Sequence, residues 1–185
     1  MKKVIFGLVG QMASGKDTAK QYLENNYQAK SCRFSDILRN VLDILGLENS
    51  RFNLQELSTN LRKLYGEDIL AKTIVNQVNK IEAKIVVVDG VRRLADIKYL
   101  NSLDNFFLIS LKADLKICYE RLIKRDENIN DDKKSYTEFI ADHQKEAELQ
   151  IEGVMKNATY HLDNNKNFED LYSQIDKIVK DWQDK

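Results

Sequence analysis

Residues 4–18 read VIFGLVGQMASGKDT, and their pattern predicts three consecutive structural elements. Its first part, Val4 to Val9, is an almost unbroken apolar run with β-branched residues, which is typical of a strand covered on both faces. Its second part, Gly10 to Thr18, fits the pattern G-x-x-x-x-G-K and leads into a helical pattern. We therefore predict a buried strand, a glycine-rich loop and a helix in direct succession.

The loop has the composition of a phosphate-binding loop. Its glycines let the backbone curl so that successive N–H groups point at phosphate oxygens, and the following helix adds the positive end of its dipole. Lys16 would neutralise charge on the β- and γ-phosphates. The alternative is a glycine-rich turn with an exposed lysine. We expect the loop to bind ATP through Gly10, Gln11, Met12, Ala13, Ser14, Gly15, Lys16, Asp17 and Thr18, with Met12 contributing packing.

The position after Lys16 departs from the usual motif, where a Ser or Thr hydroxyl holds Mg²⁺. Here it is Asp17, and Thr18 follows one step later. A carboxylate is a hard oxygen ligand and is favoured at a helix start, so either residue could contact the ion. Asp17 could also serve only as a partner of the helix dipole. Asp89, at the end of the most hydrophobic strand, is expected to complete the Mg²⁺ shell.

Composition excludes several classes of protein. The 185 residues include 29 Lys and Arg and 29 Asp and Glu, whereas domains that bind a phosphate backbone usually carry a basic surplus. Nucleic acid is therefore not an expected partner. No apolar stretch approaches the roughly 20 residues of a membrane span, and no cleavage-site pattern follows the first strand. We expect a cytoplasmic chain without a membrane partner, forming one domain over residues 1–185 as a monomer or homodimer.

Further apolar runs alternate with helical patterns along the chain. Residues 85–88 and 106–111 are strand-like, and residues 30–34 and 160–162 are more weakly so. Over residues 54–64 and 70–81, apolar residues are spaced three and four positions apart, which predicts helices. This alternation predicts an α/β, three-layer P-loop NTPase fold with about five parallel strands and helices on both faces of the sheet. Ligands of such sheets lie beyond the carboxyl ends of the strands.

The segments after the second and third strands resemble those of nucleoside monophosphate kinases and the related dephospho-CoA kinases. Residues 35–39 read SDILR and residues 89–93 read DGVRR. They are similar to the Gly-Asp-x-Leu-Arg and Asp-Gly-Phe-Pro-Arg stretches of adenylate kinases. The Gly-Lys-Asp-Thr ending of the loop resembles deoxynucleoside monophosphate kinases. Residues 119–126 are similar to the arginine-bearing helix that leads into the lid of these kinases, and residues 158–165 to the last strand and the loop bordering the adenine.

This resemblance implies transfer of the γ-phosphoryl group of ATP, with Mg²⁺, to a small nucleotide acceptor. Asp36 would orient the acceptor or take its proton, although it could instead cap a helix. Arg121 and Arg125, four apart on one helix face, would be catalytic lid arginines, although they could instead pair with surface acids. The expected lid spans roughly residues 121–145. The acceptor phosphate would be held by Arg39, Arg62 and Arg92, and Asn164 would border the nucleotide.

Three functions remain open on the sequence. A (deoxy)nucleoside monophosphate is the preferred acceptor. A dephospho-CoA kinase would need Asp36 as base, but the Leu-Phe-Glu-type segment expected after the third strand is missing. The third is a nucleotide-dependent switch or assembly ATPase without a small acceptor. Many switches borrow an arginine from a partner, whereas this chain has five plausible arginines of its own, which favours a kinase.

Overall fold

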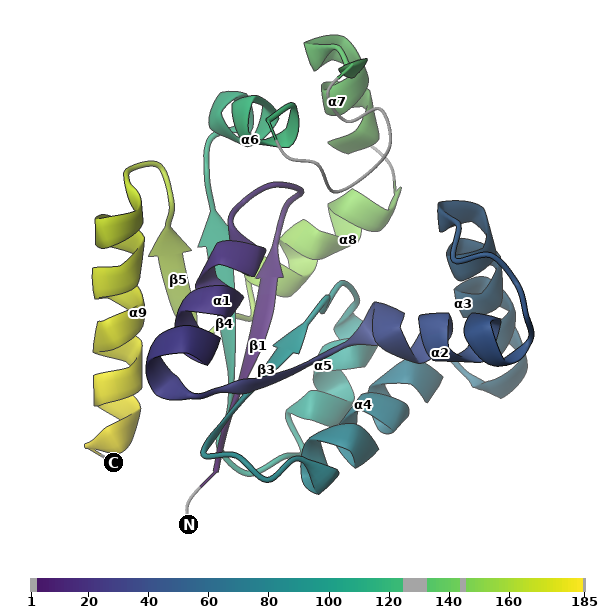
Figure 1. Cartoon of the computed structure of the whole chain (residues 1–185), viewed down its shortest axis with the longest axis horizontal. Coiled ribbons are helices and arrows are strands. Elements are labelled where there is room, and N and C mark those ends of the chain that lie inside the picture. Colours follow the sequence, from purple (N-terminus) through teal and green to yellow (C-terminus); the bar gives the residue numbers. More distant parts are fainter. Residues whose placement is uncertain (1–2, 125–132, 144–145, 185) are drawn as a thin grey trace.

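A computed structural model of the chain describes residues 3–124, 133–143 and 146–184. In these ranges five strands form one parallel sheet in the order β2-β3-β1-β4-β5 (Figure 1). The strands are β1 (Val4–Gly10), β2 (Lys30–Arg33), β3 (Ile85–Asp89), β4 (Phe106–Lys112) and β5 (Tyr160–Asp163). The predicted α/β fold with a five-stranded parallel sheet is thereby confirmed.

Helices cover both faces of this sheet and also lie beyond its carboxyl edge (Figure 1). The described helices are α1 (Lys16–Tyr27), α2 (Phe34–Ile44), α3 (Arg51–Tyr65), α4 (Ile69–Lys80), α5 (Leu94–Leu100), α6 (Leu115–Leu122), α7 (Tyr136–His143), α8 (Glu146–Met155) and α9 (Phe168–Gln183). None of the helices in the described ranges combines the length and the apolar character that a bilayer span requires.

Alternation along the strands divides the core in two. In β1, Val4, Phe6 and Leu8 face α1 and α9, whereas Ile5 and Val9 face the side covered by α2, α4, α5 and α8. Successive side chains of a strand point to opposite faces, and both faces of β1 are buried. The continuous apolar run that predicted this strand is the consequence of two covered faces.

Helix ends follow local chemistry. Ser50 caps α3, since its hydroxyl accepts a hydrogen bond from the backbone N–H of Asn53 at 3.2 Å. At the other end Gly66 has a φ of 99°, a conformation in which glycine is favoured, and the helix stops at Tyr65. The helix therefore ends where the backbone adopts a conformation that glycine allows.

Helices α6 and α7 lie beyond the carboxyl edge of the sheet, above the loop in Figure 1. A small cluster of Ala113, Cys118, Leu122 and Phe139 joins them. Met12 of the loop packs against this cluster, as does its neighbour Ala13, so the loop contacts these helices through apolar surface. Much of the expected lid, residues 125–132 and 144–145, lies outside the described residues.

Candidate nucleotide-binding site

The loop between β1 and α1 has the curled backbone that its glycines predict. Ala13 and Gly15 have φ values of 58° and 103°, and the N–H of Ser14 donates to the carbonyl of Gln11 at 3.2 Å. Gly15 precedes the first residue of α1, and a Cβ placed there would lie 2.1 Å from Nδ2 of Asn164. Glycine is therefore required at this position by both the backbone angle and the available space.

Lys16 is the first residue of α1 and folds back over the loop. Its Nζ donates to the carbonyl of Gly10 at 2.8 Å and to that of Gln11 at 2.9 Å. The ammonium group therefore lies at the mouth of the loop, against its first two carbonyl groups. Positive charge from the side chain and from the helix dipole converges there, which is the arrangement that binds phosphate groups.

Asn164, predicted to border the nucleotide, is buried and ties the end of β5 to the loop. Its Nδ2 donates to the carbonyl of Ser14 at 2.8 Å, and its backbone N–H donates to the carbonyl of Lys112 at 2.8 Å. The carbonyl of Asn164 accepts a hydrogen bond from Nη2 of Arg121 at 3.0 Å. One residue thus joins the loop to the last turn of α6.

Two buried polar atoms beside this junction have no hydrogen-bond partner within the described part of the chain. They are Oγ of Ser14 and Nη1 of Arg121. The charges of Arg121 and Lys16 also act together on the thiol of Cys118, whose pKa burial nevertheless raises. A buried donor without a partner is costly, so both atoms fit a bound group that would accept hydrogen bonds, such as a phosphate.

Two of the predicted metal ligands lie together next to the loop. Asp17 and Asp89 are bridged by Arg33, whose Nη2 lies 2.9 Å from Oδ1 of Asp17 and whose Nε lies 2.8 Å from Oδ2 of Asp89. Lys20 adds a second positive charge, at 3.0 Å from Asp17 and 3.8 Å from Asp89. Four charges of alternating sign therefore form a compact network, which we call the carboxylate network.

The charges in this network set its protonation. Partial burial alone would raise the pKa of Asp17, but the hydrogen bond and charge of Lys20, with the charges of Arg33 and Lys16, hold it below its ordinary value. Burial alone would lower the pKa of Arg33, but the charges of Asp89 and Asp17 keep it raised. Asp17 is therefore an anion, and Arg33 a cation, at neutral pH.

The oxygen donors of this region fit a magnesium ion. Mg²⁺ is bound by one or two carboxylates together with substrate phosphates and water. Asp17 and Asp89 each keep one oxygen that accepts no hydrogen bond from a described residue. Thr18 lies in the same first turn of α1. These three residues are therefore the candidates to hold the ion.

Arg33 was missed by sequence reasoning. It is the last residue of β2, and its partner in the sheet register is Asp89 of the neighbouring strand. Both residues end their strands at the carboxyl edge, where ligands of parallel sheets bind. The position of Arg33 at a strand end was the available signal, but β2 is only four residues long and its neighbour is not evident from the sequence.

The predicted acceptor-side residues divide into exposed and buried groups. Asp36 and Arg39 lie on an exposed part of α2, and Arg92 is exposed in the turn after β3. The N-cap of α2 falls at Arg33, so the carboxylate of Asp36 lies in the first turn and does not cap the helix.

Arg62 is placed differently, because its guanidinium is buried. Nη2 of Arg62 lies 3.2 Å from Oδ1 of the buried Asp96, and Nη1 donates to the carbonyl of Glu67. Asp96 also accepts hydrogen bonds from the backbone N–H groups of Arg92 and Arg93. Arg62 therefore supports the turn that carries Arg92. Arg125, the second predicted lid arginine, lies outside the described residues.

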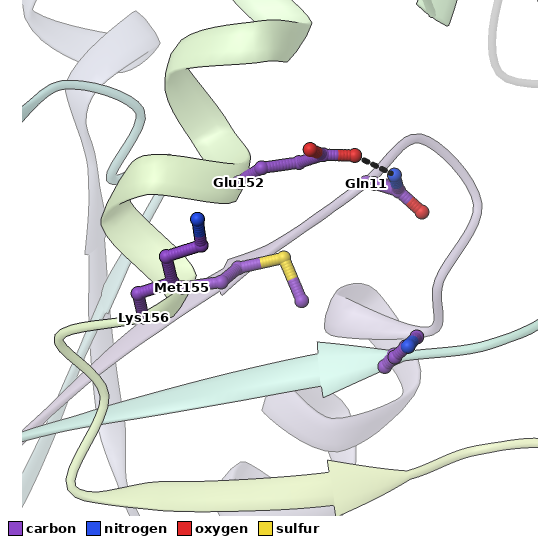
Figure 2. A pocket seen from close by; sticks show the side chains of 5 residues that line it. Gln11, Glu152, Met155 and Lys156 are labelled. Atoms are coloured by element: carbon purple, nitrogen blue, oxygen red, sulfur yellow. Dashed lines mark hydrogen bonds between the residues drawn. The ribbon is translucent and has the colours of Figure 1, made fainter.

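A separate pocket of about 260 Å³ adjoins the loop. It lies on the side of β1 where β4 pairs, whereas the carboxylate network lies on the side of β3. Figure 2 shows its lining, in which Glu152 of α8 reaches toward Gln11 and accepts a hydrogen bond at 3.4 Å. The wall is completed by Lys112 at the end of β4, Met155 at the end of α8, and Lys156, which follows α8. Gln11 is the loop residue that borders this pocket, which sequence reasoning did not anticipate.

The protein is a P-loop nucleotide-binding protein with a kinase-like fold. Three features define this class: the curled loop after β1, the lysine at its mouth and the five-stranded parallel sheet. A family model described as an AAA domain matches residues 7–149. The chain is a member of this family.

Individual proteins are similar to this chain over nearly its whole length. A UPF0200 protein of Saccharolobus islandicus (strain L.S.2.15 / Lassen #1) is 29% identical over 179 residues, which cover 96% of this chain and 92% of that protein. Among solved structures, TT1252 from Thermus thermophilus has a TM-score of 0.68 at 19% identity, covering 98% of both chains. Shikimate kinase from Bacteroides thetaiotaomicron has a TM-score of 0.64 at 13% identity, covering 97% of this chain and 98% of that one. At these identities the two structures show a shared fold.

Proposed function

We propose that the protein is a kinase that transfers the γ-phosphoryl group of ATP to a small nucleotide acceptor, with a (deoxy)nucleoside monophosphate preferred. One observation carries the proposal: two buried donors beside the loop, Oγ of Ser14 and Nη1 of Arg121, lack a partner in the described chain. A group rich in acceptor oxygens would satisfy both. The arginine belongs to this chain and needs no partner protein to supply it, which supports a kinase over a switch.

Phosphoryl transfer depends mainly on positioning and fixed positive charge. Lys16 and the loop N–H groups would bind the β- and γ-phosphates of ATP, and Arg121 would stabilise the negative charge of the transferred group. Mg²⁺, when bound, would neutralise phosphate charge, and Asp17, Thr18 and Asp89 are the residues that would hold it. Arg125 is proposed as a second lid arginine on the resemblance alone.

The acceptor would bind on the side of α2 and the turn after β3. Arg39 and Arg92 are exposed and therefore able to grip its phosphate, which would fix its direction for in-line attack. Asp36 would orient the acceptor or take a proton from its hydroxyl. Arg62 would need to leave Asp96 to reach the acceptor, so we assign it first to supporting Arg92 and only second to binding.

The test is a screen of nucleoside monophosphates and dephospho-CoA with ATP and Mg²⁺, following ADP release with and without acceptor. We expect release that depends on a nucleoside monophosphate. Lys16→Ala should abolish it while the far-ultraviolet circular dichroism spectrum is retained, and Arg121→Ala should lower kcat more than the acceptor KM. Release that depends on dephospho-CoA would reassign the acceptor. Equal release without any acceptor would indicate an ATPase switch and overturn the proposal.

A further inference from the structure

The carboxylate network has an unusual balance of charge for a site expected to receive a divalent cation. Arg33 and Lys20 contribute two positive charges, and Asp17 and Asp89 contribute two negative ones. The network is therefore neutral before any cation binds. The Asp89 side chain is 8% exposed and that of Lys20 is 15% exposed, so solvent screens these charges only partly.

A divalent cation bound by both carboxylates would lie within a few ångströms of the Arg33 guanidinium. Like charges at such separations repel strongly in a partly buried site. Arg33 has a route away from them, because its side chain is 30% exposed. It would also find new partners, since a guanidinium pairs well with phosphate oxygens. Lys20 can remain, because it contacts Asp17 from the same helix, three residues further on.

We propose that Arg33 is the exchangeable counterion of Asp17 and Asp89, which holds the two carboxylates together without metal and is displaced when a divalent cation binds with the nucleotide. The proposal rests on the proposed function, because the cation is expected to arrive with nucleotide phosphates. It assigns a role to a residue outside the loop motif, at the end of β2.

The first test measures Mn²⁺ affinity in the presence of ADP, by electron paramagnetic resonance of free Mn²⁺. Arg33→Met keeps much of the side-chain length but removes the competing charge, so we expect Mn²⁺ to bind about tenfold more tightly than to the wild type. Arg33→Lys keeps the charge and should bind Mn²⁺ within about threefold of the wild type. An Arg33→Met affinity equal to or lower than that of the wild type would overturn the proposal.

A matched control separates this effect from the loss of one positive charge on the molecule. Arg93→Met makes the same change at an exposed ion pair with Glu67, where the guanidinium lies 2.7 Å from the carboxylate. Its Mn²⁺ affinity should stay within about twofold of the wild type, because surface charges are screened by salt. An equal gain in both variants would mean that net charge alone is responsible, and would overturn the role of Arg33.

A second measurement follows the wild-type chain and needs a variant only to assign one signal. The Nε–H of Arg33 is held by Asp89 at 2.8 Å, so its proton–nitrogen NMR signal should be resolved, and Arg33→Lys should remove it. Addition of ADP with Mg²⁺ should shift or broaden this signal, whereas ADP with a chelator should not. A signal unchanged by Mg²⁺ with ADP would overturn the proposal.

The two proposals fail in different ways. If the wild type bound neither ADP nor Mn²⁺, the proposed function would be wrong and the counterion role would be wrong with it. If the wild type bound both, but Arg33→Met gained no affinity and the Nε–H signal did not move, only the counterion role would be wrong. Acceptor-dependent transfer could then still be present.

Discussion

Gly15 is the residue at which the geometry of the loop is most restricted. Its φ is 103°, and a Cβ would lie 2.1 Å from Nδ2 of Asn164. We expect Gly15→Ala to lower the free energy of unfolding by about 1–3 kcal/mol and to weaken ATP binding, because the loop and Asn164 must both move. Urea unfolding and ATP titration measure the two effects.

Gly153 provides the matched control for this substitution. It lies inside α8, where a Cβ would enter open space, and no positive φ is involved. Gly153→Ala should therefore raise the free energy of unfolding by about 0.5–1 kcal/mol, because alanine favours a helix. A Gly15→Ala protein as stable as Gly153→Ala would contradict the geometry described for the loop.

Asp17 gives the carboxylate network a pH dependence. Its pKa is lower in the folded protein than in the unfolded chain, so its charge stabilises the fold above the unfolded pKa, and this contribution is lost as the pH falls through the folded pKa. As the pH is lowered from about 5 to about 3, we expect the free energy of unfolding to fall less for Asp17→Asn than for the wild type. Thermal unfolding across this range is the measurement, and parallel curves for the two proteins would contradict it.

At the scale of elements, one carboxylate of α9 accepts hydrogen bonds from two tyrosines of α1. The hydroxyl groups of Tyr22 and Tyr27 donate to Oδ1 of Asp176 at 2.8 Å and 2.7 Å. Asp176→Ala should lower the free energy of unfolding by about 2 kcal/mol, because two hydrogen bonds to a charged group are lost. Asp181→Ala, at an exposed position of the same helix, should change it by no more than about 0.5 kcal/mol. Similar losses in chemical denaturation would show that the tyrosine contacts do not matter.

The elements also show which parts of the structure were predictable. Strands β1 and β3 are apolar runs because both of their faces are covered, β4 is a similar run with Ser110 inside it, and the sequence predicts all three directly. Helix α9 also has a visible pattern, because its buried residues Leu171, Ile175 and Val179 recur every four positions. Helix α5 has seven residues, too few for a clear period.

At the scale of the molecule, the order of the strands is what sequence patterns could not supply. The loop was predictable because its residues are contiguous. The pairing of Arg33 with Asp89 was not, because it depends on β2 and β3 being neighbours although their residues are 56 apart in sequence. Asn164 was predicted to border the nucleotide from the family resemblance, but its hydrogen bond to Ser14, 150 positions away, was not, because β4 lies between β1 and β5 in the sheet. Which strands are neighbours depends on packing between distant segments, and local sequence propensity does not predict it.

The sheet is well packed, whereas helix α3, which lies to one side in Figure 1, is packed more loosely. Every residue of β1 is buried, whereas α3 leaves Phe52, Leu64 and Tyr65 largely exposed. Segments with few buried apolar contacts open at low free energy. We therefore expect backbone amides of α3 to exchange with deuterium well before those of β1.

If the acceptor binds where we propose, bound ligands should slow deuterium exchange in some segments and leave others unchanged. Arg39 lies on α2, so an acceptor nucleotide added with ADP should slow exchange in α2 and α3, whereas ADP alone should slow it mainly in the loop and the start of α1. Hydrogen–deuterium exchange followed by mass spectrometry measures each segment separately, and β1 peptides serve as the internal control. Protection by the acceptor in α6 and α7 without any change in α2 would contradict the proposed location, since the acceptor would then be held from the opposite side of the loop.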